Sequence, residues 1–403
     1  MITDFPMAPA RTPPHITTLI LLTAVSVLTL NMFLPSMERM ARDFEVDYAL
    51  ISVALGGFLA VSAVLQLFLG PISDRIGRRP VMLGGLMVYT LASVGCALST
   101  DIYVFLAFRM LQCGVSAGMV LSRAIVRDTS PPEEAARRLA VMGTAFALAP
   151  LLAPVVGGLL DEALGWRSIF WVFAALGLGL TIVTWADLGE TNLTPSTSYL
   201  AQFRAYPDLV KSGLFWAYCV LLVCSIGGFY VFLGGAPQVG ATMFGLTPGW
   251  LGVGMGSTSG GFLLGNVFNR VMSKRLGMMR MMVYGRVVAL VGPLLAMAVF
   301  AFGGGNAVVL FGGALFIGFG NGMTLPGANA GVMSVAPRLA GSASGLAGAL
   351  TLAGGAASST LIGALVSGPY GSYILLGALA MMSGIGLCAA IVVGRLEAAR
   401  GAL

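Results

Sequence analysis

Twelve long apolar runs dominate this sequence and leave few folds open to it. Each run is roughly 20 residues long, the length that a helix needs to cross the hydrocarbon core of a bilayer. Lipid offers no hydrogen bonds to a backbone, so only helices or a closed barrel can span it, and uninterrupted apolar runs favour helices over alternating barrel strands. The runs cover residues 16–35, 49–70, 80–99, 102–122, 139–160, 167–186, 213–235, 250–268, 278–302, 306–328, 340–366 and 370–394.

The composition excludes an ordinary soluble protein. Hydrophobic residues make up 57% of the 403 residues and charged residues 9%, against about 25% charged in soluble domains. The five cysteines all fall inside the apolar runs, without disulfide or metal-ligand spacing, and His15 is the only histidine. The sequence therefore predicts no metal site, no cofactor and no catalytic machinery. Because residues 1–15 are polar and Pro-rich, we expect no cleavable signal peptide.

The basic residues predict how the chain lies across the membrane. If both termini are cytoplasmic, seventeen of the 22 Lys and Arg residues fall in inner segments, three fall in outer segments, and Arg109 and Arg286 lie inside runs. Cytoplasmic loops carry such an excess of positive charge, so we expect both termini in the cytoplasm. The net charge of +6 then reflects topology and contact with lipid headgroups, because it is dispersed over short loops, and nucleic acid is not expected as a partner.

The longest polar stretch divides the runs into two sets of six. Residues 187–212 are expected to form a cytoplasmic linker between one six-helix bundle at 1–186 and another at 213–403. The two sets also share a pattern, since Gly70, Asp74 and Arg75 follow the second run and Gly265, Asn269 and Arg270 follow the eighth with the same spacing. Parallel six-helix repeats of this kind occur in one large class of transporters.

The loop between the second and third runs carries the most specific motif. Residues 70–80 read GPISDRIGRRP. A cytoplasmic loop that served only to carry positive charge would need its arginines alone. Such a role does not explain Gly70, Asp74 and Gly77. The motif resembles the loop 2–3 signature of the major facilitator superfamily. Further stretches resemble the bicyclomycin/chloramphenicol-resistance family of drug:proton antiporters: LP at 34–35, RMLQCG at 109–114, AGMVLSRAIVRD at 117–128, ALAPLLAPVVGG at 147–158, GWRSIFW at 165–171 and AGSASGL at 340–346. Cys113 stands where that family usually has glycine.

This resemblance implies a fold and a way of working. It implies an all-α protein of a bacterial inner membrane, with twelve helices in two six-helix bundles around a central cavity that opens alternately to each side. In that fold Asp74 faces the N-terminus of the eleventh helix, near Leu339, when the cytoplasmic side is closed. The conformational latch would consist of Gly70, Asp74, Arg75, Gly77, Arg78 and Arg79. The fifth helix would bend at Pro150 and Pro154, followed by Gly157 and Gly158, and pack on the eighth helix to seal one side.

Polar residues inside the runs are the candidate cavity residues. Arg109 lies roughly 10 Å into the membrane, where an arginine costs about 2.5 kcal/mol or more unless it faces water or a partner. We expect it to face the cavity and to contact the first helix near Asn31. The remaining candidates for substrate or coupling are Gln112, Phe146, Tyr230 and Asn321. Arg286 lies near the inner end of its run, and we expect its side chain to reach outward to the headgroups.

The proton site is harder to place. Members of the resembling family carry an aspartate where this chain has Asn31, and asparagine cannot take up or release a proton at physiological pH. The acids of the chain lie in loops or at membrane edges, so no carboxylate is expected at mid-depth. Glu38, seven residues beyond Asn31 and thus about 10 Å further out, is the nearest alternative. Its neighbours Arg39, Arg42 and Asp43 equally fit a solvated loop acid.

Three functions follow from these observations. The first is export of small, largely apolar compounds in exchange for protons, by a monomer surrounded by lipid. The second, which Asn31 favours, is uptake or uncoupled uniport of a small metabolite on the same fold. The third is an intramembrane enzyme, which needs a nucleophile and a base at depth, and a chain with one terminal histidine offers no such pair.

Overall fold

The computed structural model describes residues 14–192, 209–336 and 339–401, and every element assigned along these residues is helical. Three of the helices contain the loop 2–3 motif and the prolines of the fifth run: α3 (Tyr48–Ile76), α4 (Arg78–Leu98) and α7 (Pro132–Leu164). The remaining long helices are α8 (Arg167–Asp187), α10 (Gly213–Phe244), α11 (Pro248–Leu276), α12 (Met278–Ala301), α13 (Ala307–Val335), α14 (Ala340–Leu365) and α15 (Gly371–Gly401).

Two of the expected helices are each built from three pieces. The first consists of α1 (Ile16–Asn31), the 3₁₀ turn η1 (Leu34–Ser36) and α2 (Met37–Asp43). The fourth consists of α5 (Ile102–Leu111), the 3₁₀ turn η2 (Gln112–Val115) and α6 (Ser116–Thr129). Both interruptions fall beside polar residues that the sequence places in the cavity, and local 3₁₀ geometry inside a helix often marks a functional position.

Eleven helical segments of the described chain are long and apolar enough to cross a membrane. The one expected span that is not among them is the eighth, which corresponds to the 29-residue helix α11. Its first turns are rich in glycine, serine and threonine, and its last turns carry Arg270, Lys274 and Arg275, which lower its mean hydropathy. The helices extend beyond several of the apolar runs, because the helical hydrogen-bonding pattern continues past the hydrocarbon core into the polar loops.

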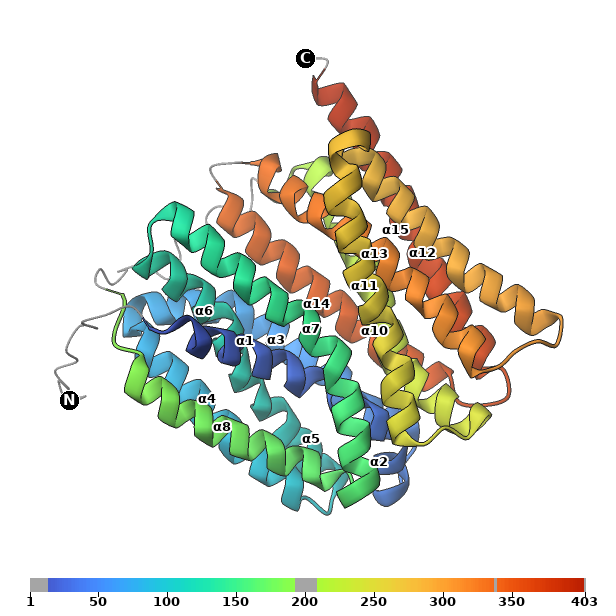
Figure 1. Ribbon diagram of the computed structural model, residues 1–403, viewed down its shortest axis with the longest axis horizontal. Coiled ribbons are helices and arrows are strands. Elements are labelled where there is room, and N and C mark those ends of the chain that lie inside the picture. The colour runs from blue at the N-terminus through green and yellow to red at the C-terminus, as the bar shows by residue number, and fades with distance from the viewer. Residues whose placement is uncertain (1–13, 193–208, 337–338, 402–403) are drawn as a thin grey trace.

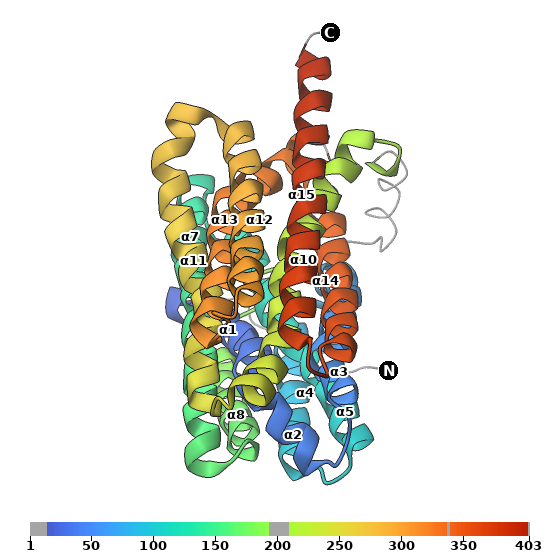
Figure 2. The same ribbon diagram turned by 90° about the vertical axis from the view of Figure 1, so that its right-hand side faces the viewer.

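The helices gather in two groups that follow their order in the chain. Helices α1–α8 lie together at the lower left of Figure 1, and α10–α15 lie mostly at the upper right, with α14 passing beside α3. Figure 2 shows the end of α15 extending beyond the other helices. Two helix pairs carry most of the contact between the groups, α3 with α14 and α7 with α11.

Glycines permit the closest approaches between the groups, all toward one end. A Cβ added at Gly158 of α7 would lie 2.1 Å from the carbonyl oxygen of Pro248, and one at Gly252 of α11 would lie 2.3 Å from that of Pro154. In the other pair, a Cβ at Gly363 would lie 2.4 Å from Ser52. Small residues let membrane helices pack backbone to backbone, and here they join the two groups.

Three of these four helices carry a glycine with open space around it toward their other ends. A Cβ added at Gly70 of α3, Gly143 of α7 or Gly341 of α14 would meet no described atom within 4 Å. These positions lie toward the ends that carry the arginine-rich loops. The glycines of the two groups are therefore in close contact at one end of the molecule, the closed end, and have open space around them at the basic end, which we call the open end.

Candidate functional site

The loop 2–3 motif forms the turn between α3 and α4, at the open end. Gly77 joins the helices with φ of 110°, a conformation that side-chain-bearing residues rarely adopt. The Arg78 guanidinium is almost buried and binds two carboxylates, with Nη1 2.5 Å from Asp74 Oδ1 and Nε 3.0 Å from Asp128 Oδ2. Asp128 lies at the end of α6, in the stretch AGMVLSRAIVRD, and that stretch alone does not indicate its contact with Arg78.

The contacts of Asp74 lie within the first group of helices in this conformation. Its carboxylate binds Arg78, and its backbone oxygen accepts a hydrogen bond from Asn192 Nδ2 at 2.6 Å. Arg79 Nη2 donates to the carbonyl of Trp185 at 2.8 Å, while Arg75 is exposed. An added Cβ at Gly70 would meet no described atom within 4 Å, so this glycine does not contact α14 in this conformation. The latch across the two groups stays a prediction for the conformation closed at this end.

We expect Asp74→Asn to slow transport while the fold stays intact. The Asp74 side chain is 41% exposed, and exposed pairs contribute about 0–1 kcal/mol, while Arg78 keeps Asp128 in the variant. The amide lacks the charge that would face the N-terminus of α14 on closure. Transport into proteoliposomes and thermal unfolding in detergent measure the two effects. A variant that transports at the parent rate would contradict the latch role of Asp74.

Arg109 lies at the centre of a buried polar cluster in the first group. Its side chain is fully buried and donates to three oxygens: Gln112 Oε1 at 2.6 Å, Thr29 O at 2.9 Å and Ala54 O at 3.3 Å. The guanidinium carbon also lies 4.2 Å from the ring centroid of Phe33 and 4.5 Å from that of Phe58. The cost of burying this charge is offset by neutral oxygens from three helical segments and by two aromatic faces.

The cluster continues through Gln112 to the third helix. Gln112 Nε2 donates to Ser93 Oγ at 2.8 Å, and the hydroxyls of Thr29 and Tyr89 lie 2.8 Å apart. Among the described residues, no carboxylate lies within ion-pair distance of Arg109. In the described part of the chain, its positive charge is therefore balanced by neutral oxygens and aromatic faces.

Asn31 ends α1, two residues beyond the backbone contact of Arg109. Its side chain is 1% exposed and its Nδ2 donates to Val27 O at 2.8 Å, within the same helix. Asn31 Oδ1 is buried without a hydrogen-bond partner. Arg109 thus reaches the first helix through the backbone of Thr29 and not through the Asn31 side chain.

The expectation that Arg286 reaches outward to the headgroups is wrong. Arg286 is 1% exposed and donates to Asn321 Oδ1 at 2.5 Å and to Thr324 Oγ1 at 3.1 Å, both on α13. Asn321 Nδ2 in turn donates to Ser225 O of α10 at 3.0 Å. The face of α12 that carries Arg286 packs against the other helices of its group. The depth of a residue in an apolar run does not indicate which face of the helix is buried.

The other candidate cavity residues are buried or lie outside the described side chains. Tyr230 of α10 is 7% exposed, and its ring lies against Gly355 of α14, where an added Cβ would be 2.2 Å from it. Asn321 is held by Arg286 and Ser225, as above. Phe146 falls in α7, but its side chain lies outside the part that the structure describes. A role for these residues in binding substrate stays a prediction.

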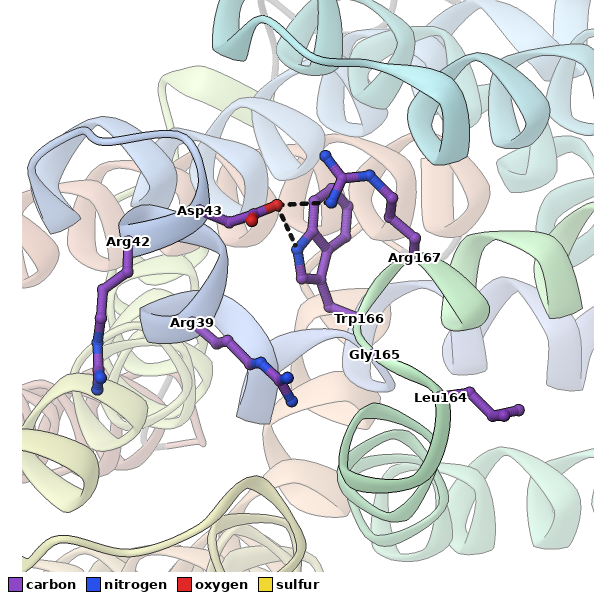
Figure 3. Close-up of a pocket in the computed structure, with 7 residues that line it drawn as sticks. All are labelled: Arg39, Arg42, Asp43, Leu164, Gly165, Trp166 and Arg167. Carbon is purple, nitrogen blue, oxygen red and sulfur yellow. Dashed lines mark hydrogen bonds and ion pairs between the residues drawn. The ribbon is translucent and has the colours of Figure 1, made fainter.

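The closed end carries a group of ion pairs around the end of α2 and the α7–α8 turn. Asp43 accepts from Arg167 Nη1 at 2.5 Å and from Trp166 Nε1 at 3.1 Å (Figure 3). Glu38 binds Arg42, with Nε 2.6 Å from Oε1, so the predicted proton site holds an ion pair one turn along its own helix. Every arginine lining the pocket in Figure 3 has an acidic partner.

Asp161 is a buried acid that the sequence reasoning placed at a membrane edge. Its side chain is fully buried in the last turn of α7, with Oδ1 2.9 Å from Arg39 Nη1. The second oxygen, Oδ2, is buried without a hydrogen-bond partner. Asp161 follows the end of its apolar run by one residue, so the run's boundary gave no indication that the carboxylate would be covered by the first helix.

The fifth expected helix corresponds to α7, which contains Pro150 and Pro154 in its interior. Gly157 and Gly158 follow these prolines and lie at the closed end. A Cβ added at Gly157 would lie 1.6 Å from the carbonyl oxygen of Met32, and Gly158 approaches Pro248 as described above. One turn further along α7, Asp161 binds Arg39 of α2. Its neighbour Glu162 accepts a hydrogen bond through Oε1 from Gly249 N of α11 at 2.9 Å. The α7 end thus touches the first helix and the second group together.

We expect Gly157→Ala to damage the protein and Gly143→Ala, in the same helix, to be harmless. The added methyl group at Gly157 has no space beside the Met32 carbonyl, and overpacking of this kind costs about 1–3 kcal/mol. At Gly143 no described atom lies within 4 Å, so alanine should gain up to about 1 kcal/mol from helix propensity. Thermal unfolding in detergent compares the two variants. Equal unfolding temperatures would contradict the close packing of Gly157 against Met32.

The amino-acid sequence is similar to those of known membrane transporters along most of its length. Residues 19–360 match the sequence family described as Major Facilitator Superfamily. The chain is 36% identical over 215 residues to the chloramphenicol resistance protein of Pseudomonas aeruginosa, a match that covers 52% of this chain and half (50%) of that protein. It is 29% identical over 361 residues to multidrug resistance protein D of Escherichia coli strain K12, covering 89% of this chain and 90% of that protein.

Solved structures show the same fold at low sequence identity. A mutant of the nucleoside transporter NupG superimposes with a TM-score of 0.74 at 15% identity, covering 94% of this chain and 99% of that one. A bacterial homologue of the human lysosomal transporter Spinster, in an inward-facing and occupied conformation, gives 0.73 at 13% identity, covering 94% and 96%.

Proposed function

Because the chain belongs to the major facilitator superfamily and is therefore a transporter of the bacterial inner membrane and not an enzyme, we propose that it exports small, largely apolar compounds in exchange for protons. The similarity to multidrug resistance protein D, which extends over nine-tenths of both chains, carries the proposal of efflux. The chloramphenicol resistance protein supports it over about half of each chain.

Alternating access is the proposed mechanism, with residues 1–186 and 213–403 moving as two bundles. It is supported by the one-sided contact between the groups of helices, which is close at Gly158, Gly252 and Gly363 and open at Gly70 and Gly341. Under the positive-inside orientation the open end faces the cytoplasm. In this state a compound reaches the protein from inside the cell, and export then requires the basic end to close and the contacts of α7 with α11 to separate.

Arg109 favours substrates that carry a hydrogen-bond acceptor. Its guanidinium donates only to neutral oxygens and has no acidic partner among the described residues. A ligand with carbonyl or anionic groups would compete with these neutral oxygens for the positive charge, while its apolar remainder fits a cavity between apolar helices. Protons would act at an acid of the closed end, Glu38 by the sequence argument.

Transport into everted membrane vesicles tests this proposal. Vesicles that contain the protein should accumulate chloramphenicol when a proton gradient is imposed, and should lose this accumulation when the gradient is collapsed. Uptake or uniport on the same fold, the alternative that Asn31 favours, predicts movement that follows the compound's own gradient and ignores the pH gradient. Equal accumulation with and without the pH gradient would remove proton exchange from the proposal.

A further inference from the structure

The carboxylate of Glu190, just beyond α8, binds the turn between α3 and α4. Its Oε1 accepts from Arg78 N at 2.9 Å, and its Oε2 accepts from Arg79 N at 3.2 Å. These two amides belong to the first turn of α4, where backbone N–H groups have no partner within the helix. A carboxylate at this position satisfies both donors and interacts favourably with the positive end of the helix dipole.

Gly77 provides the space that this carboxylate occupies. A Cβ added at Gly77 would lie 2.3 Å from Glu190 Oε2 and 2.9 Å from its carboxyl carbon. The glycine in the motif therefore has two physical reasons, its positive φ and the approach of an acid more than a hundred residues away in the sequence. The loop sequence alone gives only the first of these reasons.

The same short segment also holds the α3 side of the turn. Asn192 donates its backbone N–H to Glu190 Oε1 at 2.9 Å, and its Nδ2 donates to Asp74 O at 2.6 Å. Residues 190 and 192 thus connect the last turn of α3 to the first turn of α4. The direction in which Arg78 leaves the backbone is fixed by these contacts, and with it the pairing of its guanidinium with Asp74 and Asp128.

We propose that Glu190 is a positioning residue for the loop 2–3 motif, holding Asp74 and Arg78 in the geometry from which the open end closes. This inference rests on the proposed alternating-access function. Residues 188–192 precede the segment that joins the two groups of helices, so this contact also attaches the beginning of the connecting chain to the motif.

The test compares Glu190→Gln with Glu134→Gln. Glutamine keeps the shape but presents an NH₂ group to one of the two α4 amides. Glu134 is the matched control, because it lies in the first turn of α7 at the same end and its ion pair joins only Arg138. Both variants are made in a background without the five native cysteines that carries Gly341→Cys, a position at the open end with no described atom within 4 Å.

We expect Glu190→Gln to reduce chloramphenicol transport about fivefold, the effect of losing one helix cap, and to increase alkylation of the introduced cysteine because the basic end closes less often. Glu134→Gln should change neither. A purely structural role would lower the unfolding temperature, with alkylation at the control's level, and that result would overturn the inference. If Glu190→Gln does not insert into the membrane, Asn192→Ala takes its place. Its transport rate and the alkylation of its introduced cysteine are then compared with those of Glu134→Gln.

The two proposals fail in different ways. If the parent protein moves no chloramphenicol, the proposed function is at fault, and the alkylation of the Gly341→Cys background still compares the two variants. If the parent transports and Glu190→Gln matches Glu134→Gln in rate and alkylation, the positioning role of Glu190 is wrong while the transport function stands.

Discussion

Replacing Arg109 by methionine is expected to reduce transport by about tenfold or more, the change that about 1.4 kcal/mol in the barrier produces. The substitution removes the guanidinium that joins Thr29 of the first helix, Ala54 of the second and Gln112 of the fourth. Stability should change much less, because the variant also removes a fully buried charge that no acid neutralises among the described residues. Transport in proteoliposomes and thermal unfolding in detergent separate the two effects.

Arg286→Met is the matched control for this variant. Arg286 is also buried and held by neutral oxygens, but it lies in the other group of helices. If Arg109→Met transports at a rate close to that of the parent, the guanidinium is not needed for transport. If its rate falls no further than that of Arg286→Met, the loss of any buried arginine would explain the fall. Arg109 would then have no particular role in binding or coupling.

The contrast between these two arginines marks what depth in a sequence can and cannot predict. The position of Arg109 in its run gave its cost in lipid, and the fold of the resembling family gave the first helix as its neighbour, which the bond to Thr29 O confirms. The same depth argument failed for Arg286, because depth does not say which face of a helix turns inward. Only the position of Asn321 and Thr324 on α13 decides that.

The helices were predictable because an apolar run has to be helical in lipid, whatever its neighbours are. Long-range polar contacts were not. Glu190 lies in a polar stretch that reads as a linker, and its bonds to Arg78 and Arg79 depend on how α8 leaves the membrane beside α4. Asp161 is similar, since it is bound by Arg39 of α2 where α7 packs against α1 and η1. Sequence patterns describe one segment at a time, and these contacts join two.

Asn31→Asp is expected to make transport strongly dependent on pH. In the parent, Asn31 Nδ2 donates to Val27 O. A protonated aspartate can replace this bond with its O–H, whereas an ionised one has no donor and is attracted to Arg109, whose Nη2 lies on the neighbouring Thr29 backbone. The introduced acid thus changes partner when it gains or loses a proton, and it competes with Gln112 and Thr29 for the arginine.

The sign of this dependence follows from the two partners. As the pH falls, the introduced acid becomes neutral, keeps the bond to Val27 O, and the transport rate should approach that of the parent. As the pH rises, it ionises and draws Arg109 away, so the rate should depart from the parent's. Asn329→Asp is the control, because Asn329 of α13 makes the same kind of bond, to Leu325 O at 2.9 Å, and is exposed. If rates measured over a pH series show the same profile for both variants and the parent, Asn31 contributes only packing, and the polar end of α1 takes no part in coupling.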